Sequence, residues 1–387
     1  MTVIIVAKPS VLIDGTVFES SGRLGIWRLF FEIISRTNRD INYTLLLSQK
    51  ATQPIPEGID VCRFQRAPEL VSRRHVLWRS MRGLYQSRLR SRFPEHIWHP
   101  TFYSLDPRGT VASSKVRRLV TVYDMLSEDF YWMGDFVLQR HVKRNCLAEC
   151  HHVVAISAET ARSLERFFPE LSGRITVVPL ASNHTVDLQR INASSCPDVD
   201  LELGGRPFCL FVGGRNLYKH FEFVIRALSA KSWPAEFVLV VVGAPFEQAE
   251  IDFIRSCNVR HRVIHAGPAS DQSLRWFYQR SSSFVFPSLG EGFGLPVLES
   301  QQNGTIPILS DIPVFREVGG AGALYYPPHD IDAFIRAVGI AVDPLKRPKL
   351  LAAASANSQT FTWETAAARM VDCYATAHCS SFRRSTS

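Results

Sequence analysis

The 387-residue sequence contains no uninterrupted apolar run that approaches the roughly 20 residues needed to cross a bilayer as a helix. Its first apolar run is short, merges into a strand-like pattern, and lacks the charged start and small-residue cleavage site of a signal peptide. We therefore expect a cytoplasmic protein, either soluble or attached peripherally to the inner face of the plasma membrane.

Cysteine is also sparse, and the eight cysteines show no framework spacing, which predicts reduced, mostly buried thiols. Cys146 and Cys150 could share one face of a helix just before His152, but a strand pattern follows at once and no second ligand pair is evident. Asp198 and Asp200 form an acidic pair of a kind that can bind metal ions, yet they fall in a predicted linker. We predict no metal ion.

The length and the alternation of strand and helix patterns predict two α/β domains with parallel sheets. The predicted strands of the first half are Val3 to Val6, Tyr43 to Leu47, Val120 to Val122, Val153 to Ile156 and Ile175 to Val178. Those of the second half are Cys209 to Val212, Phe237 to Val242, Val263 to His265, Phe284 to Phe286 and Ile306 to Leu309. We place the first domain at 1–183, a linker at 184–206, the second domain at 207–362, and a final helix with a basic tail at 363–387.

Positive charge is concentrated in the first domain. Through residue 183, Lys plus Arg number 25 against 17 Asp plus Glu, whereas the two counts are equal afterwards. Much of the excess lies in 72–93, where arginines alternate with apolar residues as in a basic amphipathic helix. Such a helix can bind an anionic membrane, or it can pack its apolar face on a sheet. We expect no nucleic-acid partner, because no reader motif accompanies the charge.

The most informative segment runs from Phe284 to Glu299. A buried-looking strand ends at Pro287, a glycine-rich loop follows, and Pro296 suits the first turn of a helix. Ligands of α/β proteins bind at the carboxyl ends of parallel strands, and helix N-termini favour phosphate. Glu291 on the loop and Glu299 in the helix could then grip hydroxyl groups of the same ligand. The alternative is that both glutamates are merely solvated.

A second segment, from Phe208 to His220, places Arg215 and Lys219 after another strand and the turn at Gly213 and Gly214. Fixed cations stabilise the charge that develops when a sugar–diphosphate bond breaks, Arg by bidentate contact and Lys as a point charge. Cations near turns are commonly only solvated. The order of this segment relative to the two glutamates is what strengthens the interpretation.

These motifs resemble the retaining glycosyltransferases of family 4, nearest to mannosyltransferase-type members of polysaccharide and lipopolysaccharide assembly. The resemblance implies the GT-B fold, in which two Rossmann-like domains face each other across a cleft and the final helix crosses back towards the first domain. It also implies a nucleotide-sugar donor with no cofactor. It assigns the donor sugar to Glu291, the ribose to Glu299, and the diphosphate to Arg215 and Lys219. The remaining donor-binding candidates are Gly213, Gly214, Gly292, Phe293, Gly294 and Leu295.

Matches in the first domain are weaker. They suggest acceptor-side candidates at Gly22, Gly25, His99, Tyr123 and Asp124, with Asp124 also a candidate catalytic residue. Many relatives carry His where this chain has Tyr123, so that contact is open, although a tyrosine hydroxyl can still make a hydrogen bond. Structural capping by Asp124 is an equal alternative.

The sequence thus predicts a retaining glycosyltransferase that moves a hexose to a hydroxyl of a growing glycan or lipid-linked saccharide. GDP-mannose is the preferred donor, and a UDP-hexose is the alternative. Two other classes stay open: a nucleotide-sugar epimerase or hydrolase on the same fold, and a catalytically silent sugar-nucleotide-binding protein.

Overall fold

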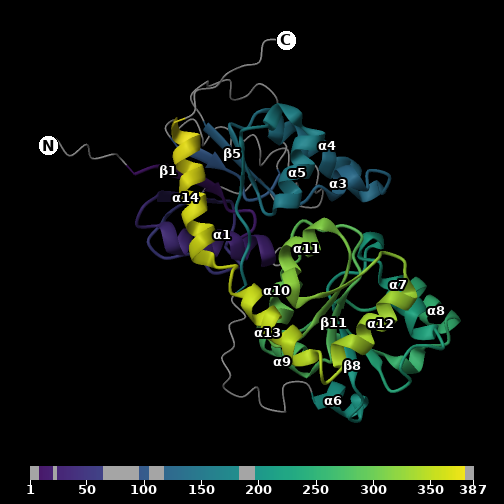
Figure 1. The fold of residues 1–387 in the computed structure, drawn as a ribbon. Coiled ribbons are helices and arrows are strands. Elements are labelled where there is room, and N and C mark those ends of the chain that lie inside the picture. The colour runs from purple at the N-terminus through teal and green to yellow at the C-terminus, as the bar shows by residue number, and fades with distance from the viewer. Residues whose placement is uncertain (1–7, 21–23, 64–95, 104–116, 183–196, 380–387) are drawn as a thin grey trace. The chain divides into compact units, whose positions relative to one another are not determined.

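The computed structural model describes residues 8–20, 24–63, 96–103, 117–182 and 197–379. The chain divides into two compact units (Figure 1). Unit 1 comprises Met1–Leu180 and Trp363–Ser387, and unit 2 comprises Ala181–Thr362. Each unit is built on a parallel sheet with helices packed against it, which is the α/β class that the sequence predicts.

The described sheet of unit 1 has the strand order β3-β2-β1-β4-β5-β6-β7, and every pairing is parallel. Its strands are β1 (Ser10–Asp14), β2 (Asn42–Leu47), β3 (Asp60–Arg63), β4 (Ile97–His99), β5 (Arg117–Val122), β6 (His152–Ala155) and β7 (Ile175–Val177). Its α-helices are α1 (Leu24–Thr37), α3 (Leu126–Asp129), α4 (Gly134–Ala148), α5 (Ala158–Phe167) and α14 (Trp363–Cys379).

The last helix, α14, belongs to unit 1 although it follows unit 2 in the sequence. Figure 1 shows it in yellow beside the purple α1, and the two helices are in contact. The residues that α14 buries recur every three or four positions, as expected for an amphipathic helix: Trp363, Ala366, Ala367, Met370, Cys373, Tyr374 and Ala377. At its start, Glu364 accepts a 2.9 Å bond from Arg36 Nε of α1.

Unit 2 contains a sheet with the order β10-β9-β8-β11-β12-β13, again with every described pairing parallel. Its strands are β8 (Phe208–Val212), β9 (Val238–Val242), β10 (Val263–Gly267), β11 (Ser283–Phe286), β12 (Pro307–Ser310) and β13 (Leu324–Tyr326). Its α-helices are α6 (Pro197–Leu203), α7 (Phe221–Ser229), α8 (Gln248–Ser256), α9 (Asp271–Arg280), α10 (Leu295–Gln302), α11 (Pro313–Gly319), α12 (Ile331–Val342) and α13 (Arg347–Ser358).

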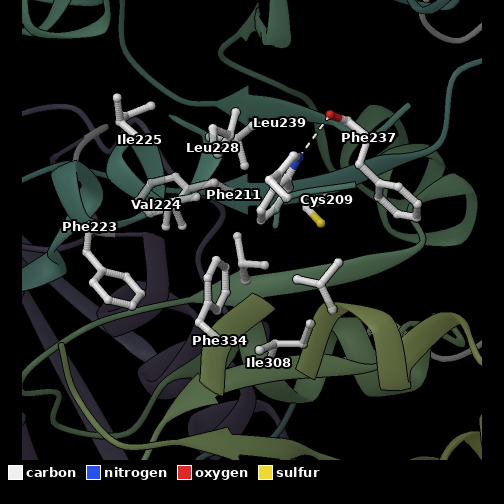
Figure 2. Close-up of a cluster of buried hydrophobic side chains, with 14 of the residues drawn as sticks. Cys209, Phe211, Phe223, Val224, Ile225, Leu228, Phe237, Leu239, Ile308 and Phe334 are labelled. Atoms are coloured by element: carbon white, nitrogen blue, oxygen red, sulfur yellow. Dashed lines mark hydrogen bonds between the residues drawn. The ribbon is translucent and has the colours of Figure 1, made fainter. Parts of the chain in front are cut away.

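Aromatic and branched side chains from the sheet and from α7 and α12 fill the core of unit 2 (Figure 2). Phe223, Tyr326 and Phe334 pack their rings on one another with centroid separations of 5.0 to 5.4 Å. Trp233 is buried in this core, and its indole N–H donates to the Phe237 carbonyl at 3.1 Å. The strands of this unit can be continuous apolar runs because helices cover both their faces.

Most of the predicted strands are confirmed to within two residues. The prediction for Val3 to Val6 lies outside the described residues, and so does the basic segment 72–93. The pattern reading missed β1, β3, β4 and β13, of which the last three have only three or four residues. The predicted linker, 184–206, contains a short helix, α6, whose Asp200 accepts a 3.0 Å ion-pair bond from Arg280.

Candidate functional site

The two predicted motifs meet at the carboxyl-terminal ends of two central strands of the unit 2 sheet. Strands β8 and β11 are neighbours, with Leu210 opposite Phe284, so their C-terminal loops emerge side by side. The Leu289 amide donates to the Tyr218 carbonyl at 2.7 Å, which joins the two loops directly. Their sequence separation therefore disappears in the fold, as Brändén's rule for parallel sheets predicts.

Lys219 and Glu291 form an ion pair across these loops. Lys219 Nζ lies 2.5 Å from Glu291 Oε1, and 4.8 Å from the centroid of the Phe286 ring. The two side chains are 17% and 10% exposed, so the pair is mostly desolvated but still reaches the surface. A cation with one carboxylate partner at an open strand edge can meet phosphate on one side while the carboxylate accepts from a hydroxyl.

Arg215 is held more tightly than the sequence predicts. Its Nε and Nη2 donate to the two carboxylate oxygens of Glu250 at 2.5 and 3.0 Å, and Nη2 also donates to the Pro245 carbonyl. Its guanidinium lies 4.9 Å from the centroid of the Phe246 ring, and the side chain is only 6% exposed. Arg215 thus forms a bidentate ion pair inside unit 2. Its side chain is therefore less available to a ligand than that of Lys219.

Sequence reasoning missed Glu250. It lies on α8 and completes a capping box with Glu247, whose amide donates to Glu250 Oε2 at 2.7 Å. The Glu-x-x-Glu spacing at the start of α8 was the available signal, but it points to a helix start and not to an arginine partner.

Two glycines lie near the carboxyl-terminal ends of the unit 2 strands, where other groups leave no room for a side chain. Gly243, which sequence reasoning also missed, has a φ of 155°, and a Cβ there would lie 2.7 Å from the Gly213 carbonyl oxygen. Gly294 has a φ of 96° and precedes α10, where a Cβ would lie 3.1 Å from the Phe315 ring. Both positions favour glycine, because side chains rarely adopt these angles.

The loop candidates divide into surface and core. Gly214 is exposed on the loop that follows β8, whereas Gly292 is buried in the loop that follows β11. Phe293 is buried as well, and its ring packs edge-on against Phe361 at 5.7 Å. Helix α10 begins at Leu295, one residue before the predicted Pro296. Phe293 therefore anchors the loop and does not line it.

Glu299 lies in the second turn of α10 and is only 7% exposed. Its carboxylate accepts a hydrogen bond from the Tyr278 hydroxyl at 3.2 Å. Sequence reasoning did not identify Tyr278, because a tyrosine in an amphipathic helix is ordinarily a core residue. The glutamate is thus a buried, partnered side chain, which excludes the simple solvated alternative for this position.

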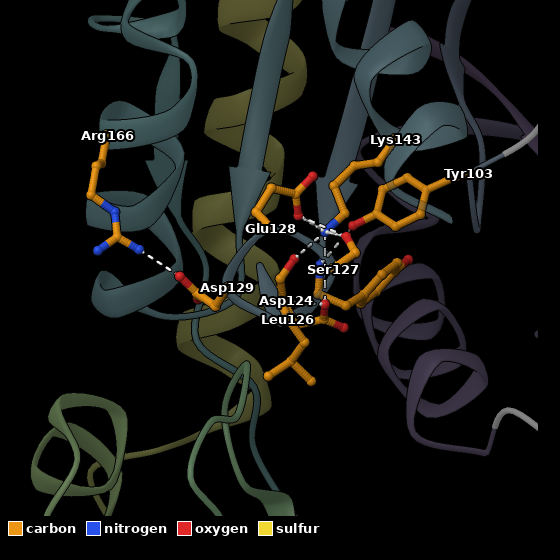
Figure 3. Close-up of polar contacts among 9 residues, drawn as sticks. Tyr103, Asp124, Leu126, Ser127, Glu128, Asp129, Lys143 and Arg166 are labelled. Atoms are coloured by element: carbon orange, nitrogen blue, oxygen red, sulfur yellow. Dashed lines mark hydrogen bonds and ion pairs between the residues drawn. The ribbon is translucent and has the colours of Figure 1, made fainter. Parts of the chain in front are cut away.

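In unit 1, Asp124 follows β5 and belongs to a polar network around a buried lysine (Figure 3). Asp124 Oδ1 accepts from the Leu126 amide at 3.1 Å, so the carboxylate caps the turn that opens α3. Lys143 Nζ donates to the Asp124 carbonyl, to Ser127 Oγ and to Glu128 Oε2 at 2.7 to 2.9 Å. The capping alternative for Asp124 is therefore present in the structure.

Tyr123 and His99 lie in the interior of unit 1. The Tyr123 hydroxyl donates to the Thr101 carbonyl at 2.6 Å. The His99 ring is fully buried, with Nδ1 2.9 Å from the Tyr374 hydroxyl and Nε2 2.8 Å from Thr121 Oγ1. Both ring nitrogens thus have partners within the unit. His99 is thus a core group in this structure, and its role as an acceptor-side residue stays a prediction.

Burial lowers the pKa of His99 to about 3, because the charged ring would lose its hydration. Below the ordinary pKa near 6.5, the unfolded chain takes up a proton that the folded chain does not. Stability should therefore fall as pH falls from about 6.5 towards 3, by up to roughly 1.4 kcal/mol per pH unit. Denaturant unfolding across this range tests this expectation, with His99→Gln as the comparison. An equal pH slope in both proteins would contradict it.

The structure gives little evidence for the two remaining acceptor-side candidates, Gly22 and Gly25. Gly22 lies outside the described residues, and Gly25 is an exposed residue in the first turn of α1.

Cys150 is buried, and its thiol donates to the Leu147 carbonyl at 3.0 Å. Within the described residues, no group of three or more His, Cys, Asp or Glu is arranged to hold a metal ion. None of the described helices is long and apolar enough to cross a membrane.

Residues 198–359, which include the whole strand edge described above, match the sequence family described as Glycosyl transferases group 1. Residues 198–359 thus resemble a group 1 glycosyl transferase domain. Among curated relatives, the O-antigen chain mannosyltransferase RfbU of Salmonella typhimurium is 26% identical over 216 residues, which cover 54% of this chain and 57% of RfbU. A D-inositol 3-phosphate glycosyltransferase of Streptomyces griseus is 35% identical over 265 residues, covering 60% and 55%. The chain thus spans little more than half the length of these two curated relatives.

Solved structures extend the similarity to both units. Sucrose-phosphate synthase from Thermosynechococcus elongatus aligns over 95% of this chain and 98% of its own, with a TM-score of 0.72 and 17% identity. WaaG, a glycosyltransferase of lipopolysaccharide biosynthesis, aligns over 94% and 98%, with a TM-score of 0.67 and 13% identity. At such identities the similarity establishes the fold. The chain thus has the GT-B fold, as predicted.

Proposed function

We propose that this protein is a retaining glycosyltransferase that moves a hexose from a nucleotide sugar to a hydroxyl of a growing glycan or lipid-linked saccharide. The observation that carries the proposal is the ion pair of Lys219 and Glu291, which unites the two motifs at the edge of β8 and β11. Mannose from GDP-mannose is the preferred donor, because relatives named as mannosyltransferases are among the matches. Other relatives are named as D-inositol 3-phosphate glycosyltransferases, so the binding experiment below also includes nucleotides other than GDP.

The proposed chemistry uses position and charge, without a covalent enzyme intermediate. The acceptor hydroxyl attacks the anomeric carbon on the face that the diphosphate leaves, and its proton passes to a leaving phosphate oxygen. Lys219 stabilises the charge that builds on that phosphate, and Glu291 accepts hydrogen bonds from the donor sugar. Arg215, fixed by Glu250, adds a positive charge close to the same edge.

Binding of a nucleoside diphosphate tests this proposal first. A ligand that binds only the folded state raises its stability, by about 2.7 kcal/mol at a hundredfold excess over Kd. We expect thermal unfolding to shift upward with GDP more than with UDP, ADP or TDP at matched concentrations. A selective shift with UDP would redirect the donor to a UDP-hexose, and no shift with any nucleotide would contradict the donor site.

We propose that the transfer needs no metal ion, because Lys219 can stabilise the leaving phosphate at the proposed position. Treatment with EDTA followed by gel filtration should then leave the rate of nucleotide release within about twofold of the untreated protein. A large loss that Mg²⁺ or Mn²⁺ restores would contradict this expectation.

The acceptor side remains a proposal drawn from unit 1. Among its acceptor-side candidates, His99 and Tyr123 are buried, whereas 22% of the Asp124 side chain is open to solvent. We propose that an anionic membrane brings a lipid-linked acceptor to this unit. The basic segment 72–93, which we predict to bind that membrane, lies outside the described residues.

A further inference from the structure

Glu299 and Tyr278 form a buried pair between two helices of unit 2. The Tyr278 hydroxyl, on α9, donates to Glu299 Oε2, on α10, at 3.2 Å. Tyr278 is completely buried and Glu299 nearly so. A hydrogen bond to an ionised group in such surroundings restrains both partners, because water cannot substitute for either.

Tyr278 is itself fixed from several directions. Its carbonyl oxygen accepts from Ser281 Oγ at 2.9 Å and also from Thr305 Oγ1. Its ring packs edge-on against Phe284 of β11, with the centroids 5.6 Å apart. The backbone and the ring of Tyr278 are therefore both restrained, and α9 presents the hydroxyl to the carboxylate as a donor.

The hydroxyl also keeps its proton. Burial raises the pKa of Tyr278 well above its usual value, and the negative charge of Glu299 raises it further. Across the working range of an enzyme, Tyr278 is thus a donor and Glu299 is the acceptor.

We propose that Tyr278 is a positioning residue, which orients the Glu299 carboxylate to accept hydrogen bonds from the ribose hydroxyls of the nucleotide. This inference rests on the proposed function, in which Glu299 contacts the ribose. Tyr278 does not touch the ligand and acts through the carboxylate. Discrimination between ribose and deoxyribose should therefore depend on a hydroxyl group in the neighbouring helix.

The matched control is Tyr326. It is buried in the same unit, yet its hydroxyl has no hydrogen-bond partner within the described part of the chain. Tyr278→Phe and Tyr326→Phe each remove one buried hydroxyl and leave the ring in place. Only the first removes a donor to Glu299, so general effects of the substitution appear equally in both variants.

The experiment measures Kd by calorimetry for GDP and UDP and for their 2′-deoxy and 3′-deoxy forms. For the tighter-binding ribonucleotide we expect Tyr278→Phe to raise Kd about tenfold, the usual scale for a hydrogen bond to a charged group. For the deoxy form that lacks the hydroxyl bound by Glu299, Kd should change less than about twofold. Tyr326→Phe should leave every Kd within about twofold of the wild type.

A second arm tests the route through the carboxylate. In a Glu299→Gln background, adding Tyr278→Phe should have no further effect on affinity, because the oriented charge is already absent. This background also removes the buried negative charge, so it provides the measurement if Tyr278→Phe alone does not fold.

Three results would overturn the inference. One is an unchanged ribonucleotide Kd in Tyr278→Phe, and another is an equal loss for ribo and deoxy forms, which would indicate a structural role alone. The third is an additive effect in the Glu299→Gln background. Failure of the wild-type protein to bind any of these nucleotides would instead overturn the proposed function itself, so the two failures are distinguishable.

Discussion

Replacing Lys143 with methionine is expected to destabilise unit 1 by about 3–5 kcal/mol, the usual cost of leaving one charge of a buried ion pair unpaired. Lys143 and Glu128 have no exposed side-chain surface, and Nζ lies 2.7 Å from Glu128 Oε2. Removing the lysine leaves a buried carboxylate that already has one oxygen without a hydrogen-bond partner in the described structure. Denaturant unfolding, followed by a probe that reports on unit 1, measures the change.

The double replacement Lys143→Met with Glu128→Leu is the control for this prediction. It removes both charges, so most of the lost stability should return. If Lys143→Met alone were as stable as the wild type, the ion pair of Lys143 and Glu128, drawn in Figure 3, would not stabilise unit 1. A double variant less stable than the single one would contradict the explanation by unpaired charge.

Replacing Lys219 with alanine is expected to lower turnover by about 10²–10³, as removal of one fixed donor from a developing anion does in other enzymes. Its Nζ is the more accessible cation at the strand edge, and Glu291 holds it there at 2.5 Å. The measurement is the rate of nucleoside diphosphate release from the donor that the binding series identifies. Thermal unfolding is measured alongside, because the substitution also leaves the mostly desolvated Glu291 carboxylate without this cation.

Lys231 provides the matched control for that prediction. It is an exposed lysine of unit 2, outside both motifs, and Lys231→Ala should retain full turnover. Turnover of Lys219→Ala within about threefold of the wild type would contradict the role proposed for Lys219 in stabilising the leaving group.

The sequence was sufficient for the fold because its patterns are local. Continuous apolar runs such as Phe237 to Val242 indicate buried parallel strands, and strand order then brings the loops after β8 and β11 together. The meeting of Lys219 with Glu291 follows from that topology. The short strands β3, β4 and β13 were missed, since three or four residues give too little periodicity to recognise.

Side-chain partners depend on contacts between distant segments, and these were not predictable from local pattern. Arg215 pairs with Glu250, thirty-five positions away, and is largely withdrawn from solvent. His99 packs against Tyr374 of a helix 275 positions further on, which makes a candidate ligand-binding residue a core residue. In both cases tertiary packing decides the availability of a polar group whose type alone suggested function.

The measurement that tests the central claim most directly is the reaction itself. The purified protein is incubated with GDP-mannose or a UDP-hexose labelled at the anomeric carbon, with and without a panel of free and lipid-linked saccharides. We expect nucleoside diphosphate release that depends on an acceptor, and NMR of the product should show the anomeric configuration of the donor. Release of free or epimerised sugar without an acceptor, or a product of inverted configuration, would contradict retaining glycosyl transfer.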